Sequence, residues 1–137
     1  SEKRGKVYCN VYVNLSDYDG QEIKYWFELT DIAGNKDVSR EYKIDVDNTK
    51  PIINDFSYNV DRMRVEFFFN ITEPNFDEIV YIDYKDRISR ESRLCSRLRN
   101  GICEVIKSFK SGEHDLTFFI KDEAGNIVEE STSFSIN

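Results

Sequence analysis

The sequence of 137 residues predicts an all-β protein, in which one complete β-sandwich follows the last strands of another. Three observations lead to this prediction. Apolar and polar residues alternate with a period of two along much of the chain, and one motif recurs after 91 residues. The aromatic content of 14% supplies enough large side chains to fill a sandwich core, and no convincing long amphipathic helix is present.

The recurring motif is Asp-x-Ala-Gly-Asn, preceded in each copy by an alternating apolar segment. The two copies occupy residues 25–35 and 116–126. Glycine and asparagine tolerate positive φ, and the aspartate carboxylate can accept turn N–H groups. Each copy therefore predicts a hairpin turn between paired strands, with a set of calcium ligands as the alternative interpretation.

Residues 1–47 contain three expected strands, at 7–15, 23–29 and 42–46. Pro51 lacks an N–H and restricts the residue before it, so we expect a short linker at 48–51. The predicted division is a partial module at 1–47, the linker, and a complete module at 52–137. Three strands alone would leave an apolar face and unpaired edges, which a neighbouring chain could complete, unless the missing strands precede Ser1.

The complete module has its own set of expected strands, at 53–58, 65–71, 80–84, 103–105, 116–120 and 134–136. Residues 85–101 are expected to form an irregular or partly helical crossover. About seven short strands without a long helix predict an immunoglobulin-like Greek-key sandwich.

One group of residues resembles the tandem immunoglobulin-like repeats of bacterial and archaeal surface proteins, of the S-layer, adhesin or filament type: Gly112, Leu116, Phe118, Ile120, Asp122, Ala124, Gly125 and Asn126. Asp47-Asn48-Thr49-Lys50-Pro51 is similar to the Asp-Asn-Thr-x-Pro joint between such repeats. The resemblance implies an extracellular, cell-surface scaffold or adhesin. The module differs from antibody-type domains, because it lacks their strand-C Trp and their inter-sheet cysteine spacing.

The cysteines indicate a disulfide between Cys95 and Cys103, which are separated by seven residues that include the turn dipeptide Asn100-Gly101. Such a bond implies an oxidising compartment. Two reduced, buried thiols are the alternative. Cys9 aligns with Cys103 in the repeat, and a partner equivalent to Cys95 would fall near position 1. The cysteine spacing does not fit a zinc site.

The net charge of −7 argues against general binding of nucleic acid or anionic membranes. Residues 85–99 carry six basic and two acidic residues, a net +4, which leaves −11 for the rest. This stretch is either a solvated loop or an interface in which the basic crossover of one module meets an acidic surface of the next. The interface residues expected there are Arg87, Arg90, Arg93 and Arg97.

Three further sites are predicted from side-chain type and position. Trp26 is expected on the outward face beside Tyr8 and Tyr12, as a contact for a protein or sugar partner or as a cover for the module junction. Asn14 and Asn70 begin N-glycosylation sequons and are expected to face outward. A calcium site is expected from the oxygens of Asp31, Asp45, Asp47 and Asn48, and no other cofactor is expected.

No catalytic constellation accompanies the lone His114, so we expect no enzymatic activity. We expect the chain to serve as an extracellular structural module of a prokaryotic surface or filament protein, and more specifically of an archaeal one. The expected partners are other copies of the chain or neighbouring modules, with no nucleic acid and no membrane insertion. The alternative is an adhesin-type module that binds a glycan or a protein.

Overall fold

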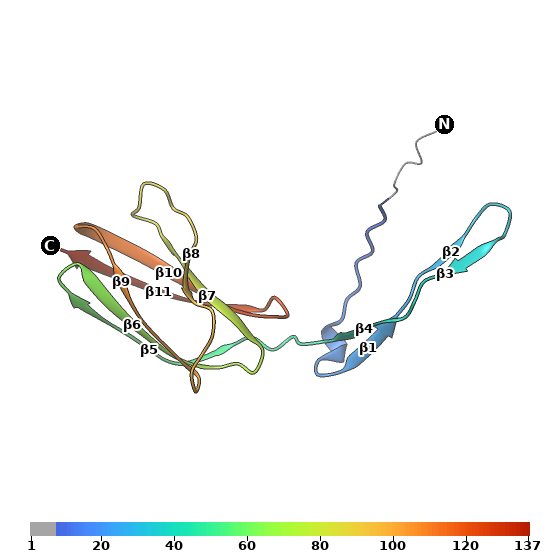
Figure 1. The fold of residues 1–137 in the computed structure, drawn as a ribbon, viewed down its shortest axis with the longest axis horizontal. Coiled ribbons are helices and arrows are strands. Elements are labelled where there is room, and N and C mark those ends of the chain that lie inside the picture. Colours follow the sequence, from blue (N-terminus) through green and yellow to red (C-terminus); the bar gives the residue numbers. More distant parts are fainter. Residues whose placement is uncertain (1–7) are drawn as a thin grey trace. The chain divides into compact units, whose positions relative to one another are not determined.

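The computed structural model describes residues 8–137 of the chain. It divides into two compact units, of which the first ends at Asn48 and the second covers Thr49–Asn137 (Figure 1). The boundary falls within the segment 48–51, where the sequence predicts a linker.

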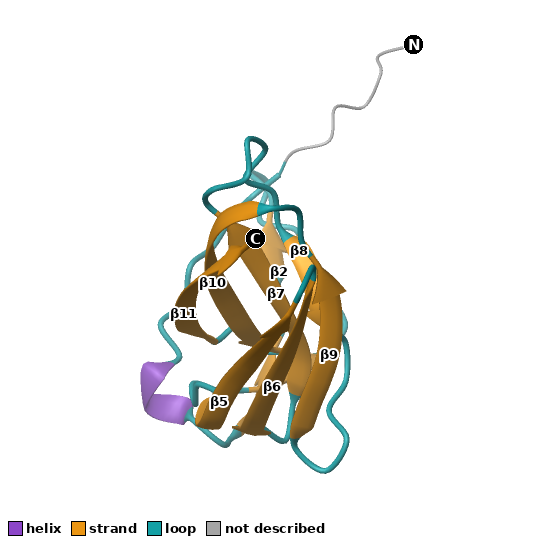
Figure 2. Ribbon diagram, turned by 90° about the vertical axis from the view of Figure 1, so that its left-hand side faces the viewer, coloured by secondary structure: helices purple, strands orange, loops and turns teal. Residues whose placement is uncertain are grey.

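Unit 2 is a β-sandwich of two antiparallel sheets, which Figure 2 shows as two layers. One sheet has the order β5-β6-β9, with β5 at Ile52–Asp61, β6 at Arg64–Thr72 and β9 at Ile102–Ser108. The other has the order β11-β10-β7-β8, with β7 at Phe76–Asp83, β8 at Ser92–Cys95, β10 at Gly112–Asp122 and β11 at Ile127–Ile136. The chain crosses between the sheets after β6, β8 and β9, so the predicted immunoglobulin-like Greek-key sandwich is confirmed.

The core follows the alternation read from the sequence. On β6 the inward side chains are Val65, Phe67, Phe69 and Ile71, with at most 3% of their surface exposed. On β10 the inward residues Leu116, Phe118 and Ile120 are fully buried. Edge-to-face ring contacts join the two sheets at Phe67–Phe118 and Phe69–Phe118.

The segment expected as an irregular crossover contains strand β8 and a tight turn, and has no helix. Asn100 and Gly101 both have positive φ, of 52° and 78°, and Arg99 and Ile102 exchange two backbone hydrogen bonds of 2.9 Å. This confirms the predicted Asn-Gly turn. Strand β8 escapes sequence prediction because it has only four residues, the first two of which are polar, and only pairing with β7 makes them a strand.

Cys95 and Cys103 form the predicted disulfide, with their Cα atoms 6.3 Å apart. Cys95 ends β8 and Cys103 lies near the start of β9, and these are edge strands of opposite sheets. The bond therefore ties the two sheets together along one side of the sandwich.

Both Asp-x-Ala-Gly-Asn motifs fold into the same hairpin turn. In the first copy, the two carboxylate oxygens of Asp31 accept the backbone N–H and the side-chain amide of Asn35, at 2.8 and 2.7 Å. In the second, Asp122 accepts the same two groups of Asn126, both at 2.8 Å. Each motif uses its carboxylate to close the turn, which supports the turn interpretation over the calcium interpretation.

Unit 1 contains one long two-stranded hairpin. Its inner part pairs β1 (Glu22–Tyr25) with β4 (Tyr42–Asp45), and its outer part pairs β2 (Glu28–Thr30) with β3 (Lys36–Val38). The three-residue 3-10 helix η1 (Ser16–Tyr18) precedes it. No helix among the described residues is long and apolar enough to cross a membrane.

The strand expected at 7–15 is wrong for residues 8–15, which have no strand, and Val7 lies outside the described residues. The physical reason is the lack of a partner. In unit 2 the cysteine-bearing strand β9 is paired to β6, whereas the described part of unit 1 has no counterpart of β6. An alternating sequence becomes a strand only where another strand offers it hydrogen bonds.

Candidate functional site

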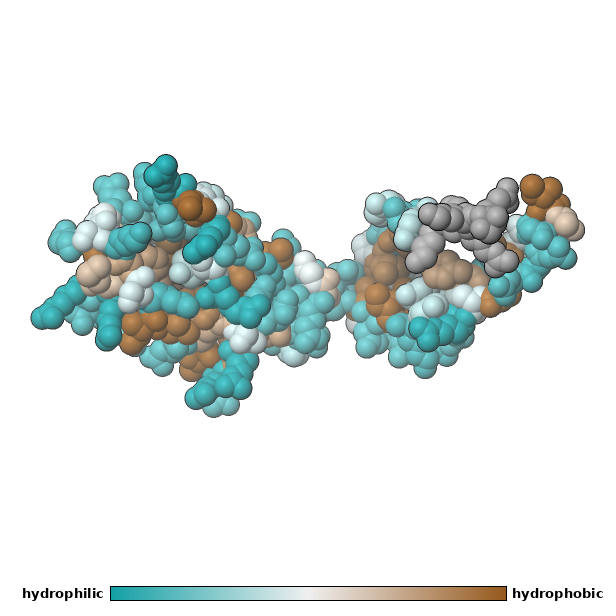
Figure 3. Space-filling view, turned by 45° about the horizontal axis from the view of Figure 1, so that its top comes forward, coloured by the Kyte–Doolittle hydropathy of each residue, from teal (hydrophilic) through white to brown (hydrophobic). Residues whose placement is uncertain are grey.

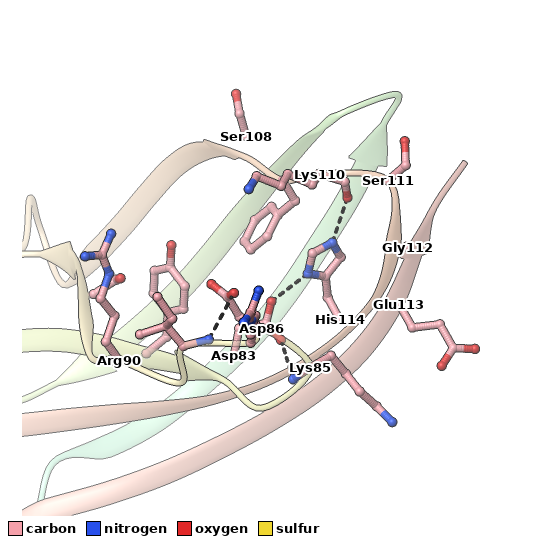
Figure 4. Close-up of a pocket in the computed structure, with 15 residues that line it drawn as sticks. Asp83, Lys85, Asp86, Arg90, Ser108, Lys110, Ser111, Gly112, Glu113 and His114 are labelled. Atoms are coloured by element: carbon pink, nitrogen blue, oxygen red, sulfur yellow. Dashed lines mark hydrogen bonds and ion pairs between the residues drawn. The ribbon is translucent and has the colours of Figure 1, made fainter.

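An open pocket with a volume of about 490 Å³ lies in unit 2 where β7 ends and β10 begins (Figure 4). The connection from β7 to β8 forms one wall, and the turn from β9 to β10 forms the other. The lining is mostly polar and includes four long cationic side chains: Lys85, Arg87, Arg90 and Lys110.

Asp83 and His114 form an ion pair at the base of this pocket. His114 Nδ1 lies 2.6 Å from Asp83 Oδ2, and His114 Nε2 lies 2.8 Å from the carbonyl oxygen of Lys110. The other carboxylate oxygen of Asp83 accepts the backbone N–H groups of Lys85 and Asp115, at 3.0 and 3.2 Å. Both nitrogens of His114 thus face acceptors, an arrangement that suits the doubly protonated, charged ring.

These two groups occupy inward positions at the ends of adjacent strands. Asp83 lies on the inward face at the end of β7, and His114 precedes the buried series of β10 that begins at Leu116. The His114 ring stacks on Phe134 at 5.3 Å and meets Phe109 edge-on at 5.0 Å. Sequence analysis missed the pair. Its detectable signal was two ionisable residues at core-facing positions of neighbouring strands.

The environment shifts the pKa values of both groups in the directions that favour the charged pair. Burial lowers the pKa of His114, but the hydrogen bonds to Asp83 and to the Lys110 carbonyl, with the nearby charges of Asp83 and Asp86, outweigh it and raise the pKa above 6.5. Burial raises the pKa of Asp83, and the hydrogen bonds from His114, Asp115 and Lys85 reverse this and lower it below 3.8.

This pair predicts a specific pH dependence of stability. Because the pKa of His114 is raised on folding, its contribution is complete below pH 6.5 and is lost as the pH rises through the folded-state pKa. Because folding lowers the pKa of Asp83, the contribution of Asp83 to stability is lost only as the pH falls below 3.8. We expect His114→Gln to lower the free energy of unfolding by about 1.5 kcal/mol at about pH 5.5, and by less at about pH 8.5. Urea unfolding at both pH values measures this, and an equal loss at the two would contradict it.

The arginines expected at a basic interface lie at two ends of β8, and an interface at these residues stays a prediction. Strand β8 runs antiparallel to β7, so the segment before β8 lies at the Asp83 end of β7 and the turn after β8 lies at its other end (Figure 1). Arg87 and Arg90 therefore line the pocket, whereas Arg97 lies in the distant turn.

Arg93 differs from the pocket arginines because it pairs with an acidic residue of the neighbouring strand. Its Nε donates to Glu78 Oε2 at 2.9 Å, and Lys121 Nζ contacts Glu78 Oε1 at 3.5 Å. The hydrogen bond from Arg93, with the charge of Lys121, lowers the pKa of Glu78 against the opposing effect of burial. Arg93 is thus paired within the module while 67% of its side chain stays exposed, and its contact with a partner stays a prediction.

Trp26 is exposed, with 53% of its surface accessible, and its Nε1 donates to Glu28 Oε1 at 3.2 Å. Among residues 8–137 its ring makes no ring contact with Tyr8 or Tyr12, so the expected aromatic patch does not form around it. The rings that gather in unit 1 belong to the opposite set, with Tyr25 and Tyr42 stacked at 5.3 Å. A partner contact at Trp26 stays a prediction.

The structure does not assemble the expected calcium ligands into one site. Asp45 pairs with Glu22 at the base of the hairpin, whereas Asp31 begins the turn at its tip. Asp31 therefore cannot share an ion with Asp45 and Asp47, and its carboxylate already closes the turn. The side-chain amide of Asn48 donates to the carbonyls of Leu15 and Ser16, at 3.2 and 3.4 Å. Calcium binding at Asp45, Asp47 and Asn48 stays a prediction.

The two sequon asparagines differ in their surroundings. Asn14 is exposed, but it precedes η1 and lies outside any strand, and its Oδ1 accepts the backbone N–H and hydroxyl of Ser16 at 3.0 and 2.7 Å. Asn70 lies on the outer face of β6 and is half-buried. Glycosylation at either site stays a prediction.

No protein-family model and no curated protein sequence matches this chain. Among solved structures, a match is the PKD1 domain of Vibrio anguillarum Epp, with 13% sequence identity and a TM-score of 0.48. The match covers 66% of this chain and 98% of that domain. The immunoglobulin-like assignment accordingly rests on the strand order and pairing of unit 2.

Proposed function

We propose that this chain is a structural segment of an extracellular prokaryotic surface or filament protein built from immunoglobulin-like modules. In this proposal unit 1 is the last part of a module, and strands equivalent to β5–β8 complete it. Assembly of the modules, and not catalysis, is the function.

The observation that carries the proposal is a difference in burial between matched residues of the repeat. Leu116, Phe118 and Ile120 are fully buried in unit 2. Their counterparts in unit 1, Tyr25, Phe27 and Leu29, are 41%, 57% and 73% exposed. Figure 3 shows apolar, brown surface over the first unit. Burying the surface that Phe27 and Leu29 still expose would contribute about 1–2 kcal/mol for each side chain.

Open strand edges in unit 1 also support completion by further strands. In unit 2, β10 is paired on both sides, to β7 and to β11. Within residues 8–137, its counterparts β1 and β2 are paired on one side only, to β4 and β3. An isolated two-stranded hairpin is marginally stable in water, and an open edge is a template for a further strand. The disulfide at Cys95 and Cys103 supports the extracellular part of the proposal, because such bonds persist in oxidising compartments.

A chimera tests the completion directly. When Cys9 is aligned with Cys103, which shifts the register by three residues from that of the turn motif, Tyr8 corresponds to Ile102. A second copy of residues 52–101 placed before Tyr8 therefore supplies β5–β8 in matching order. We expect residues 8–48 to change from protease-sensitive to protease-resistant. The exposed thiol of Cys9 should become unreactive, because it matches Cys103 and would meet the added Cys95. A matched control carries Phe67→Asp and Phe69→Asp in the added copy only, and should give no protection.

The unmodified chain provides the opposing outcome. If residues 8–48 resist protease as well as unit 2 does in a dilute, monomeric sample, they need no completion and the proposal is wrong. Sedimentation over a concentration series identifies the source of the strands. Protection that appears only on association would support completion by neighbouring copies.

The alternative, an adhesin-type binding module, is favoured by one observation, the polar pocket of unit 2.

A further inference from the structure

We infer that the pocket at the Asp83–His114 end of unit 2 is a binding site for the carboxylate side chains of an acidic polypeptide segment. The inference concerns unit 2 alone, so it does not depend on whether unit 1 is completed by further strands.

The pocket holds cations whose charges are not used within the module. In the part of the chain that the structure describes, no ion pair involves Lys85, Arg87, Arg90 or Lys110. All four residues line the same pocket, although the Lys85 side chain points away from Arg90 in Figure 4. Arg87 and Arg90 come from the wall before β8, and Lys110 comes from the opposite wall before β10. A group placed between the walls can therefore meet positive charge from both sides.

The acidic residues that line the pocket are outnumbered by its cations, because only Asp86 and Glu113 stand outside the Asp83–His114 ion pair. Asp83 is engaged by His114 and by two backbone N–H groups. Asp86 accepts the backbone N–H of Ile88 at 3.4 Å. Glu113 points away from Arg90 in Figure 4. The ion pair of Asp83 and His114 has no net charge, so it neither adds to nor subtracts from this balance.

The lining favours a peptide carboxylate over a sugar or a nucleic acid. Sugars and bases bind on exposed aromatic faces, but Phe109 is buried and the half-buried Tyr81 packs against Phe109 and Phe118. Two arginines suit carboxylates, which they bind through paired N–H groups.

Binding of a fluorescein-labelled hexaglutamate peptide to the full chain, followed by anisotropy at low ionic strength, tests the site. The chain offers a matched pair of double variants. The pocket variant combines Arg87→Glu and Arg90→Glu. The distant variant combines Arg97→Glu and Arg99→Glu, and it changes the charge by the same amount at the opposite end of β8. We expect the pocket variant to weaken binding by about tenfold or more, and the distant variant by about twofold or less. Added salt should weaken the wild-type interaction, because exposed charges are screened.

Three outcomes would overturn the inference. Equal losses in the two variants would show attraction by overall charge and not by the pocket. Absence of binding at low ionic strength would remove the site. If an oligogalacturonate of the same length competed equally well, the site would recognise carboxylates without regard to the backbone that carries them. That result would contradict the assignment to a polypeptide. Arg87→Gln with Arg90→Gln repeats the test with a smaller change, and circular dichroism checks that each variant is folded.

Discussion

Replacing Phe118 with alanine is expected to lower the free energy of unfolding of unit 2 by about 3–5 kcal/mol, because a buried aromatic side chain leaves a cavity when it is removed. Phe118 is fully buried and its ring lies 5.1–5.5 Å from the rings of Phe56, Phe67 and Phe69. Urea unfolding followed by far-ultraviolet circular dichroism measures the change. Trp26, the single tryptophan, lies in unit 1, so its fluorescence reports that unit separately.

Phe27→Ala is the control, since Phe27 is the counterpart of Phe118 in the repeat. With 57% of its surface exposed, Phe27 should contribute less than about 0.5 kcal/mol in the chain as it stands. A loss of several kcal/mol at Phe27 would contradict this expectation. It would mean that the residue is buried in solution against a partner strand. In the chimera described above, by contrast, Phe27→Ala should become costly.

Removing the disulfide is expected to have the second largest effect. Cys95→Ala with Cys103→Ala opens a loop whose ends are eight residues apart in sequence, and loop-closure entropy puts the loss at about 2.5 kcal/mol. The bond joins edge strands of opposite sheets, so we also expect β8 to lose protection from hydrogen exchange before β6 or β10 does.

Chemical denaturation with and without a reducing agent measures the effect of the disulfide. Reduction of the wild-type chain should reproduce the loss seen in the double variant. Cys9→Ser, which changes an exposed thiol outside the bond, should leave stability unchanged. A double variant as stable as the wild type would show that the hydrogen bonds between β7 and β8 alone hold the edge strand in place.

Local chemistry made several elements predictable. The alternation around Phe67 and around Phe118 predicted inward faces, because successive side chains of a strand point to opposite sides. Asn100 and Gly101 predicted a tight turn, because few other residues tolerate positive φ. The short spacing of Cys95 and Cys103 around that turn predicted their disulfide.

Other features depended on partners far away in the chain. Residues 8–15 have the alternation of a strand but no strand beside them, so they do not form one. Ser92–Cys95 lack a strong pattern but pair with β7. The arginines of residues 85–99 are close together in sequence, but they lie on and around β8 and toward both of its ends. One of them, Arg93, is paired with Glu78.

The sequence by itself determined that the chain is all-β and that it divides near residue 48. The alternation of apolar and polar residues, the turn residues and the cysteine spacing carry that information, because each is a pattern of a few neighbouring residues. Only the tertiary structure decided that Asp83 meets His114 and that Lys110 faces the same pocket as Arg87 and Arg90. Those groups are brought together by strand pairing between β7 and β10, a long-range contact that no local pattern in the chain specifies.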